Sequence, residues 1–214
     1  MTQKNYVIAI TRQFGSGGRD IGIRTAELLG VPYYDRTKLE KEAVERDETL
    51  KSLVEFSEQG VTGFNTMKYP LGIGSELKQD RLFEVQSDLV LEHAEKESCV
   101  IIGRCADYLL RERDNVIRCY IFAPYAARIA DRMHVLEDAG PNPQRIVEEV
   151  DKARAEYYRS RTGCEVNNTR YRDLFLNSNL LGKEGTAQLL AGVARKKFNL
   201  PDTTEEATEM TKEA

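Results

Sequence analysis

The sequence predicts an α/β fold around a mostly parallel sheet, because short apolar runs alternate along the chain with longer polar segments of helical periodicity. The first run, residues 6–11 (YVIAIT), is almost continuously apolar, which is typical of a strand covered on both faces. A glycine-rich turn follows it, and Ile21, Thr25 and Leu28 then recur on one face of a helix. The chain therefore opens with a strand, a turn and a helix.

The remaining elements continue this alternation. Gly30 ends the first helix, and residues 31–34 (VPYY) form a short strand that closes on Asp35. We expect three more strands, at residues 99–102 (CVII), 116–123 (VIRCYIFA) and 173–177 (DLFLN). We expect the later helices at about residues 80–97, 125–139, 143–162 and 183–197.

Two stretches do not fit a minimal alternation of strands and helices. Residues 37–79 begin as a charged helix and then become rich in glycine. Residues 125–170 form two helices joined at GPNP and end in an arginine-rich segment. We interpret both stretches as insertions at the edge of the core that are mobile or face a ligand.

Composition narrows the class of protein. With 41% hydrophobic and 31% charged residues and no apolar run long enough to span a membrane, the chain is predicted to be a soluble globular protein. Residues 1–10 lack the features of a signal peptide, and the four cysteines show no C-x-x-C spacing. We therefore expect a cytoplasmic protein with free thiols.

The net charge is concentrated at the end of the chain. The stretch 201–214 (PDTTEEATEMTKEA) holds five acids and one lysine, and removing these from the chain's 31 basic and 35 acidic residues leaves 30 of each. We expect this tail to be disordered and residues 1–200 to form one domain. A balanced domain lacks the basic excess of a nucleic-acid-binding protein, so we expect small-molecule partners rather than nucleic acid or a membrane.

The turn after the first strand suits a bound phosphate. It places backbone N–H groups and the positive end of a helix dipole around one point. Gly15, Gly17 and Gly18 have no side chain, so the backbone can approach a ligand closely there. The alternative is a tight turn that binds nothing, but the glycine density and the strand–turn–helix context favour the phosphate.

Neither common glycine pattern matches this turn strictly. The dinucleotide pattern G-x-G-x-x-G would need a glycine at Asp20. The P-loop pattern G-x-x-x-x-G-K-[ST] has Gln13, Arg19 and Asp20 in the places of its first glycine, its lysine and its hydroxyl residue. The lysine and the hydroxyl group of an ordinary P-loop are therefore absent from the turn.

Polar residues also follow other strands of the predicted sheet. Asp35 and Arg36 come after the second strand, Arg104 after the third and Asn177 at the end of the fifth. In an open parallel sheet, ligands bind beyond the carboxyl ends of the strands. We expect these residues to converge on one crevice with the glycine-rich turn.

An arginine-rich helix adds a further basic group. In residues 151–163 (DKARAEYYRSRTG), Arg154 and Arg161 are seven apart and share one helical face, with Arg159 close by. Guanidinium groups bind phosphate oxygens in pairs and can neutralise charge in phosphoryl transfer. A solvated helix with i, i+4 ion pairs is the alternative interpretation. The local excess, five arginines and two acids over residues 154–172, favours an anionic ligand.

Taken in order, these stretches resemble the cytidylate kinase-like proteins, which are related to bacterial cytidylate kinases. The stretches are ITRQFGSGGRDIG, VPYYD, IIGRCADYLL, an arginine-bearing helix and DLFLNSNLLG, over about residues 6–198. The resemblance implies a P-loop kinase-like three-layer fold with a five-stranded parallel sheet. Residues 37–79 would be a monophosphate-binding insertion, and about 125–165 an arginine-rich lid. It also implies ATP-dependent phosphoryl transfer to a nucleoside monophosphate, cytidylate-like, or to a related small phosphate acceptor, with Mg²⁺.

The resemblance assigns roles at the turn. Residues 15–18, including Ser16, would hold the phosphates of ATP. Arg19 would stand in for the missing lysine, and Asp20 or Asp35 would organise Mg²⁺. A carboxylate at position 20 repels phosphate unless Mg²⁺ bridges the two groups. Alternatively, Asp20 pairs with Arg19 or occupies the anion position itself.

The resemblance also assigns roles around the acceptor. Arg104 matches the arginine of the family's G-R-D motif and would hold the acceptor phosphate, although Cys105 replaces the aspartate. Asp35, Arg36 and Asp107 would complete the acceptor site.

For the lid, Arg154 and Arg161 match the pattern R-D-x-x-D-x-x-R, with Ala155 and Tyr158 in place of its acids. Together with Arg159, the two arginines would close over the transferring group.

Two functions remain open at this point. The first is a nucleotide kinase that uses ATP and Mg²⁺. The second is a nucleotide- or anion-binding module that kept the fold and lost catalysis, which the missing lysine and hydroxyl group suggest.

Overall fold

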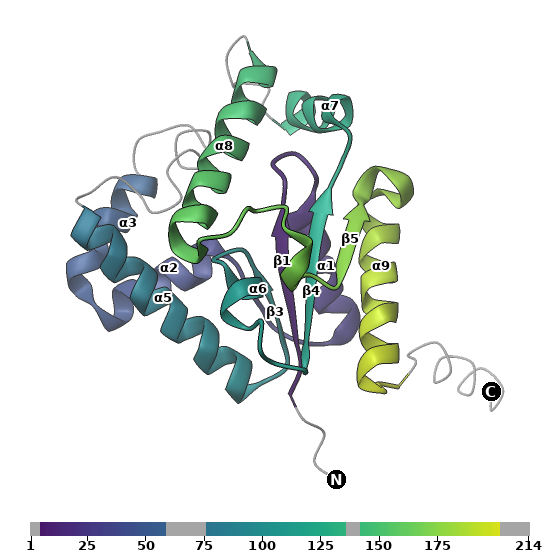
Figure 1. The fold of residues 1–214 in the computed structure, drawn as a ribbon, viewed down its shortest axis with the longest axis horizontal. Coiled ribbons are helices and arrows are strands. Elements are labelled where there is room, and N and C mark those ends of the chain that lie inside the picture. The colour runs from purple at the N-terminus through teal and green to yellow at the C-terminus, as the bar shows by residue number, and fades with distance from the viewer. Residues whose placement is uncertain (1–4, 59–75, 136–141, 202–214) are drawn as a thin grey trace, which may run out of the picture.

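The computed structural model describes residues 5–58, 76–135 and 142–201, and it confirms the predicted α/β fold (Figure 1). Five strands pair in parallel in the order β2-β3-β1-β4-β5. They are β1 (Val7–Arg12), β2 (Tyr33–Tyr34), β3 (Cys99–Ile102), β4 (Val116–Phe122) and β5 (Leu174–Asn177). Each strand therefore lies where the apolar runs predict it, with β1 at the centre of the sheet.

Helices cover both faces of the sheet, so the fold has three layers (Figure 1). One face carries α1 (Gly18–Leu29) and α9 (Ser178–Phe198). The other carries α2 (Arg36–Arg46), α3 (Lys51–Glu58), α5 (Glu76–Lys96) and the single turn α6 (Ala106–Leu109). Beyond the carboxyl ends of the strands lie α7 (Tyr125–Val135) and α8 (Pro143–Thr162). The carboxyl edge of the sheet thus faces α8.

The central strand shows why its sequence is continuously apolar. Val7 and Ala9 pack into the core beneath α2 and α5, whereas Ile8 and Ile10 pack against α1 and α9. All four side chains are at most 1% exposed. Burying a large aliphatic side chain contributes about 1.5–3 kcal/mol, so the two-sided packing of β1 fixes the centre of the fold.

The start of α2 follows from local chemistry, whereas α9 starts earlier than the sequence predicts. Asp35 caps α2, because its carboxylate accepts a hydrogen bond from the Lys38 amide at 3.1 Å. The last helix starts at Ser178, before the predicted position near 183, and is broken at Gly182 (φ 67°, ψ −179°). The predicted start therefore falls at the break, and Lys183 is the first residue after it.

Several predicted features lie outside the described residues: most of the glycine-rich part of the first insertion (59–75), the joint between α7 and α8 (136–141) and the tail from residue 202. Within the described part of the chain, none of the helices combines the length and apolarity needed to cross a membrane.

Candidate functional site

A cavity of about 510 Å³ lies at the carboxyl edge of the sheet. Its walls are formed by the turn after β1, the start of α1, the ends of β2 and β3, and α8. Ligands bind at this edge in open parallel sheets. The structure therefore brings the glycine-rich turn, Asp35, Arg36 and Arg104 to one hollow, as their positions in the sequence predict. The expectation for Asn177 is wrong: it does not line this cavity, because its side chain caps α9 by accepting from the Asn179 amide at 3.0 Å.

The turn presents free backbone donors to this cavity. Gly17 adopts the left-handed conformation (φ +70°) and is the N-cap of α1. The first amide of the helix to find a partner is that of Ile21, which donates to the Gly17 carbonyl at 3.0 Å. The preceding amides, from Gly18 to Asp20, have no acceptor within the helix. Unpaired amides and the positive end of a helix dipole are features that suit an anion.

Two serines hold the shape of the turn. The hydroxyl of Ser16 donates to the Gln13 carbonyl at 2.9 Å, and Ser16 is only 3% exposed. The hydroxyl of Ser178 donates to the Ser16 carbonyl at 2.7 Å. The Ser16 side chain is thus turned into the protein, so what it can offer a ligand is its amide.

Arg12, the last residue of β1, is a site residue that the sequence patterns did not single out. It lines the cavity between two glycines: a Cβ atom at Gly103 would lie 2.3 Å from its Nη1, and one at Gly18 would lie 2.6 Å from its Cβ. Burial, and then the positive charges of Arg154 and Arg104, lower the pKa of Arg12 well below its usual value. A buried cation among like charges is a place where a bound anion would be stabilised.

Two more arginines that line the cavity share one carboxylate. The Nη2 of Arg104 and the Nε of Arg36 each lie 2.7 Å from the same Oε1 atom of Glu40. Arg104 and Glu40 are almost fully buried. Two guanidinium groups therefore meet at one carboxylate beside the cavity.

The charged residues at the start of α1 are both held in ion pairs. Arg19 contacts Asp35, with Nη2 at 2.7 Å and Nε at 2.8 Å from Oδ2. Asp20 contacts Lys183 of α9, with Oδ2 at 2.8 Å from Nζ. The pairing of Asp20 with Arg19, one of the alternatives that the sequence left open, is therefore not found.

Of the three arginines that the resemblance assigns to a lid, only one lines the cavity. Arg154 does so, and its Nη1 donates to the Arg12 carbonyl at 3.4 Å. Arg159 pairs with Glu165 and its side chain is 61% exposed, because five residues turn a helix by about 140° from Arg154. Arg161 shares the face of Arg154 but lies two turns further along, where it pairs with Asp80 of α5.

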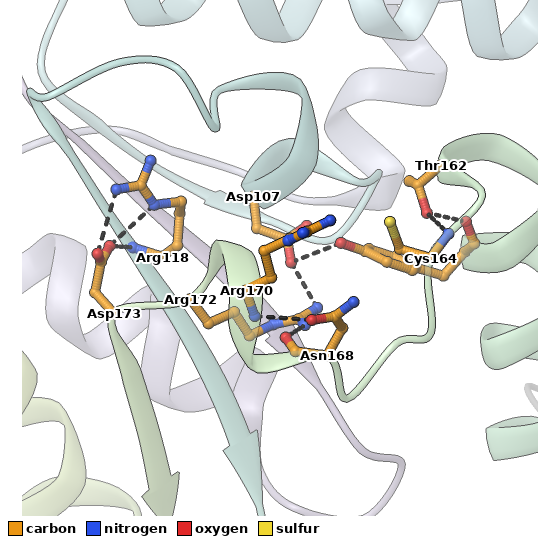
Figure 2. Close-up of polar contacts among 9 residues, drawn as sticks. Asp107, Arg118, Thr162, Cys164, Asn168, Arg170, Arg172 and Asp173 are labelled. Carbon is orange, nitrogen blue, oxygen red and sulfur yellow. Dashed lines mark hydrogen bonds and ion pairs between the residues drawn. The ribbon is translucent and has the colours of Figure 1, made fainter.

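Asp107 lies behind the cavity rather than in its wall. Its side chain is fully buried, with Oδ2 at 2.6 Å from Nη2 of Arg172 and accepting from the Tyr158 hydroxyl at 3.2 Å. Figure 2 shows this pair, and Nη1 of Arg172 also donates to the Asn168 carbonyl at 2.7 Å. Tyr158 lines the cavity, so Asp107 positions α8 and the segment before β5 instead of contacting a ligand directly.

Replacing Gly103 with alanine is expected to weaken the binding of inorganic phosphate by about 10-fold. The new Cβ would displace the Arg12 guanidinium, and φ of +87° at residue 103 disfavours any side chain. Calorimetric titration with inorganic phosphate measures the loss. Gly192→Ala in α9 is the matched control, since open space surrounds that position. Wild-type affinity in the Gly103 variant would show that Arg12 does not bind the anion.

Comparisons with known proteins agree with this architecture. The model of the cytidylate kinase-like family matches residues 7–180. No curated protein sequence matches the chain. An uncharacterized protein from Eubacterium ventriosum ATCC 27560 has a similar structure, with a TM-score of 0.62 and 21% identity over 92% of this chain and 100% of that chain.

Two kinases of known structure also share the fold. A shikimate kinase from Acinetobacter baumannii has a TM-score of 0.52 and 14% identity over 89% of this chain and 93% of its own. A gluconokinase from Sinorhizobium meliloti 1021 has a TM-score of 0.50 and 15% identity over 92% of this chain and 97% of its own. The fold is that of the P-loop kinases, and since the family model spans most of its length, the chain belongs to the cytidylate kinase-like family.

Proposed function

We propose that this protein transfers a phosphoryl group from ATP to a small phosphate-bearing acceptor, a nucleoside monophosphate being the first candidate. The observation that carries the proposal is the position of Arg12. Its side chain lies against Gly18 of the turn and against Gly103, and the positive charges of Arg154 and Arg104 act on its guanidinium. Catalysis of phosphoryl transfer is mainly positioning and charge stabilisation, which such a cluster supplies.

The residues divide into a donor side and an acceptor side. The amides of Gly15, Ser16, Gly17 and Gly18 and the N-terminus of α1 bind the donor phosphates. Arg36 and Arg104 bind the phosphate of the acceptor. Arg12 and Arg154 stand between the two sides, where negative charge gathers during transfer, and α8 shields the group from water.

The carboxylates near the turn differ in how well they fit Mg²⁺. Both oxygens of Asp35 already accept hydrogen bonds, one from the Lys38 amide and one from Arg19. Asp20 uses only Oδ2, toward Lys183. Across the described residues, no three metal-ligating side chains gather. Mg²⁺ is commonly bound by one or two carboxylates together with substrate phosphates. We assign that role to Asp20 first; bound there, the ion would neutralise phosphate charge.

A second candidate function is nucleotide or anion binding without catalysis. The ion pairs of Arg19 with Asp35 and of Asp20 with Lys183 favour it, because they engage the two residues that stand in the places of the P-loop lysine and hydroxyl. In that case the turn would bind phosphate through its amides alone.

Calorimetry with ATP, with and without Mg²⁺, followed by a transfer assay with a panel of nucleoside monophosphates, tests both functions. The kinase should bind ATP and phosphorylate at least one acceptor of the panel. Binding without transfer to any acceptor would favour the binding module. Absence of ATP binding in both conditions would contradict both candidates.

A further inference from the structure

Lys183 crosses the phosphate-binding turn from a distant part of the chain. It follows the break at Gly182 in α9, and its stem lies so close to Gly17 that a Cβ there would be 2.8 Å from its Cε and 3.0 Å from its Cγ. Gly17 therefore has two roles: it allows the left-handed backbone conformation of the turn, and it leaves room for the side chain of Lys183. The stem ends beside the first turn of α1, where the free amides lie.

The ammonium group of Lys183 is held between two carboxylates. Its Nζ is 2.8 Å from Oδ2 of Asp20 in α1 and 3.2 Å from Oδ1 of Asp131 in α7. The hydrogen bond that Lys183 donates to Asp20 is the main cause that raises the pKa of Lys183, so the group stays charged at neutral pH. The side chain is still 44% exposed, and it can change partners without leaving a buried site.

The turn supplies no lysine at Gly18 or at the next residue, Arg19, which stands in the place of the P-loop lysine. A side chain at Gly18 would collide with Arg12 at 2.6 Å. Arg19, the next residue, points to Asp35. Lys183 contacts the turn at Gly17 and Asp20. It therefore brings a compact charge on a flexible stem close to the α1 amides.

We propose that Lys183 supplies, from α9, the ammonium group that binds the donor phosphates in place of the lysine missing from the turn. The inference rests on the proposed function, since it assigns a phosphate contact at the same site. Without ligand, Asp20 is the counter-ion of Lys183. When phosphate binds, its oxygens take over that role, and Lys183 together with the α1 amides holds them.

Calorimetry of the full chain with ATP and with inorganic tripolyphosphate, both without Mg²⁺, tests this role. Lys183→Met should weaken the binding of both probes by about 10-fold or more, the loss expected for a charge-assisted hydrogen bond. Lys183→Arg should recover part of the affinity. Lys196→Met, which removes an exposed lysine from the same helix, should bind both probes like the wild type.

Asp20→Asn separates phosphate binding from a structural role of the ion pair. It removes the carboxylate charge from the pair but keeps the ammonium, so in the absence of Mg²⁺ tripolyphosphate should bind as tightly as to the wild type, or more tightly. If Asp20→Asn lost as much affinity as Lys183→Met, the pair would merely hold the turn in shape, and the inference would be overturned.

Two further outcomes separate this inference from the proposed function. If the wild type binds the probes and Lys183→Met binds them equally well, Lys183 has no such role, while the proposed function stands. If the wild type binds neither probe, with or without Mg²⁺, the proposed function fails and the role of Lys183 fails with it.

Discussion

Replacing Arg12 with methionine is expected to lower kcat/KM for phosphoryl transfer by about 100-fold or more while the protein stays folded. Arg12 is a mostly buried cation whose nearest charged neighbours include Arg104 and Arg154. Removing its charge relieves that repulsion, so the free energy of unfolding should stay constant or increase. A loss of activity with unchanged or increased stability is the signature of a residue kept for function.

Steady-state kinetics and thermal unfolding of the same samples test this expectation. Arg24→Met is the matched control, because Arg24 lies on α1 but pairs with Glu27 and Glu184 away from the cavity. Unchanged kcat/KM in the Arg12 variant would remove Arg12 from the site. A large fall in its melting temperature would instead assign the residue to packing.

Replacing Asp107 with asparagine is expected to destabilise the fold by about 3–5 kcal/mol. The change leaves the Arg172 guanidinium buried without its counter-charge, since the two side chains are 1% and 0% exposed. Nε of Arg172 and Oδ1 of Asp107 already have no hydrogen-bond partner within the described structure. The Asn168 carbonyl, which also accepts from this guanidinium, carries no counter-charge and does not compensate for the loss.

Urea unfolding measures this cost, and two further variants identify its cause. Asp107→Asn combined with Arg172→Met removes both charges and should recover much of the lost stability. Asp173→Asn is the control, because the Arg118–Asp173 pair beside it in Figure 2 is more exposed and should cost about 1 kcal/mol or less. Equal losses in the Asp107 and Asp173 variants would show that burial does not set the cost.

Much of the fold follows from local sequence signals. The apolar run of β1 packs on both faces as such runs do, through Val7 and Ala9 on one side and Ile8 and Ile10 on the other. The bounds of α8 match the prediction because Pro143 begins the helix and Gly163 ends it in the left-handed conformation. Short apolar runs and helix caps depend on residues that are close in the sequence, so the elements that they determine can be predicted from the sequence.

The candidate site depends on contacts that the sequence does not display. The glycine patterns start at residue 13, so they pass over Arg12, whose significance appears only when Gly103 is seen beside it. Helical periodicity places Arg154 and Arg161 on one face. It cannot predict that Arg161 pairs with Asp80 of α5 whereas Arg154 donates to the carbonyl of Arg12 at the end of β1. The partner of Asp20 is 163 residues away along the chain.

The fit of Arg12 against Gly103 restricts how this protein can change. The guanidinium occupies the volume that a side chain at position 103 would need, and Gly103 already has a backbone angle that disfavours one. A larger residue at 103 would push the Arg12 guanidinium, the far end of a flexible side chain, out of this volume. The two positions, at the ends of the neighbouring strands β1 and β3, are therefore coupled, because the guanidinium keeps its place only while residue 103 has no side chain.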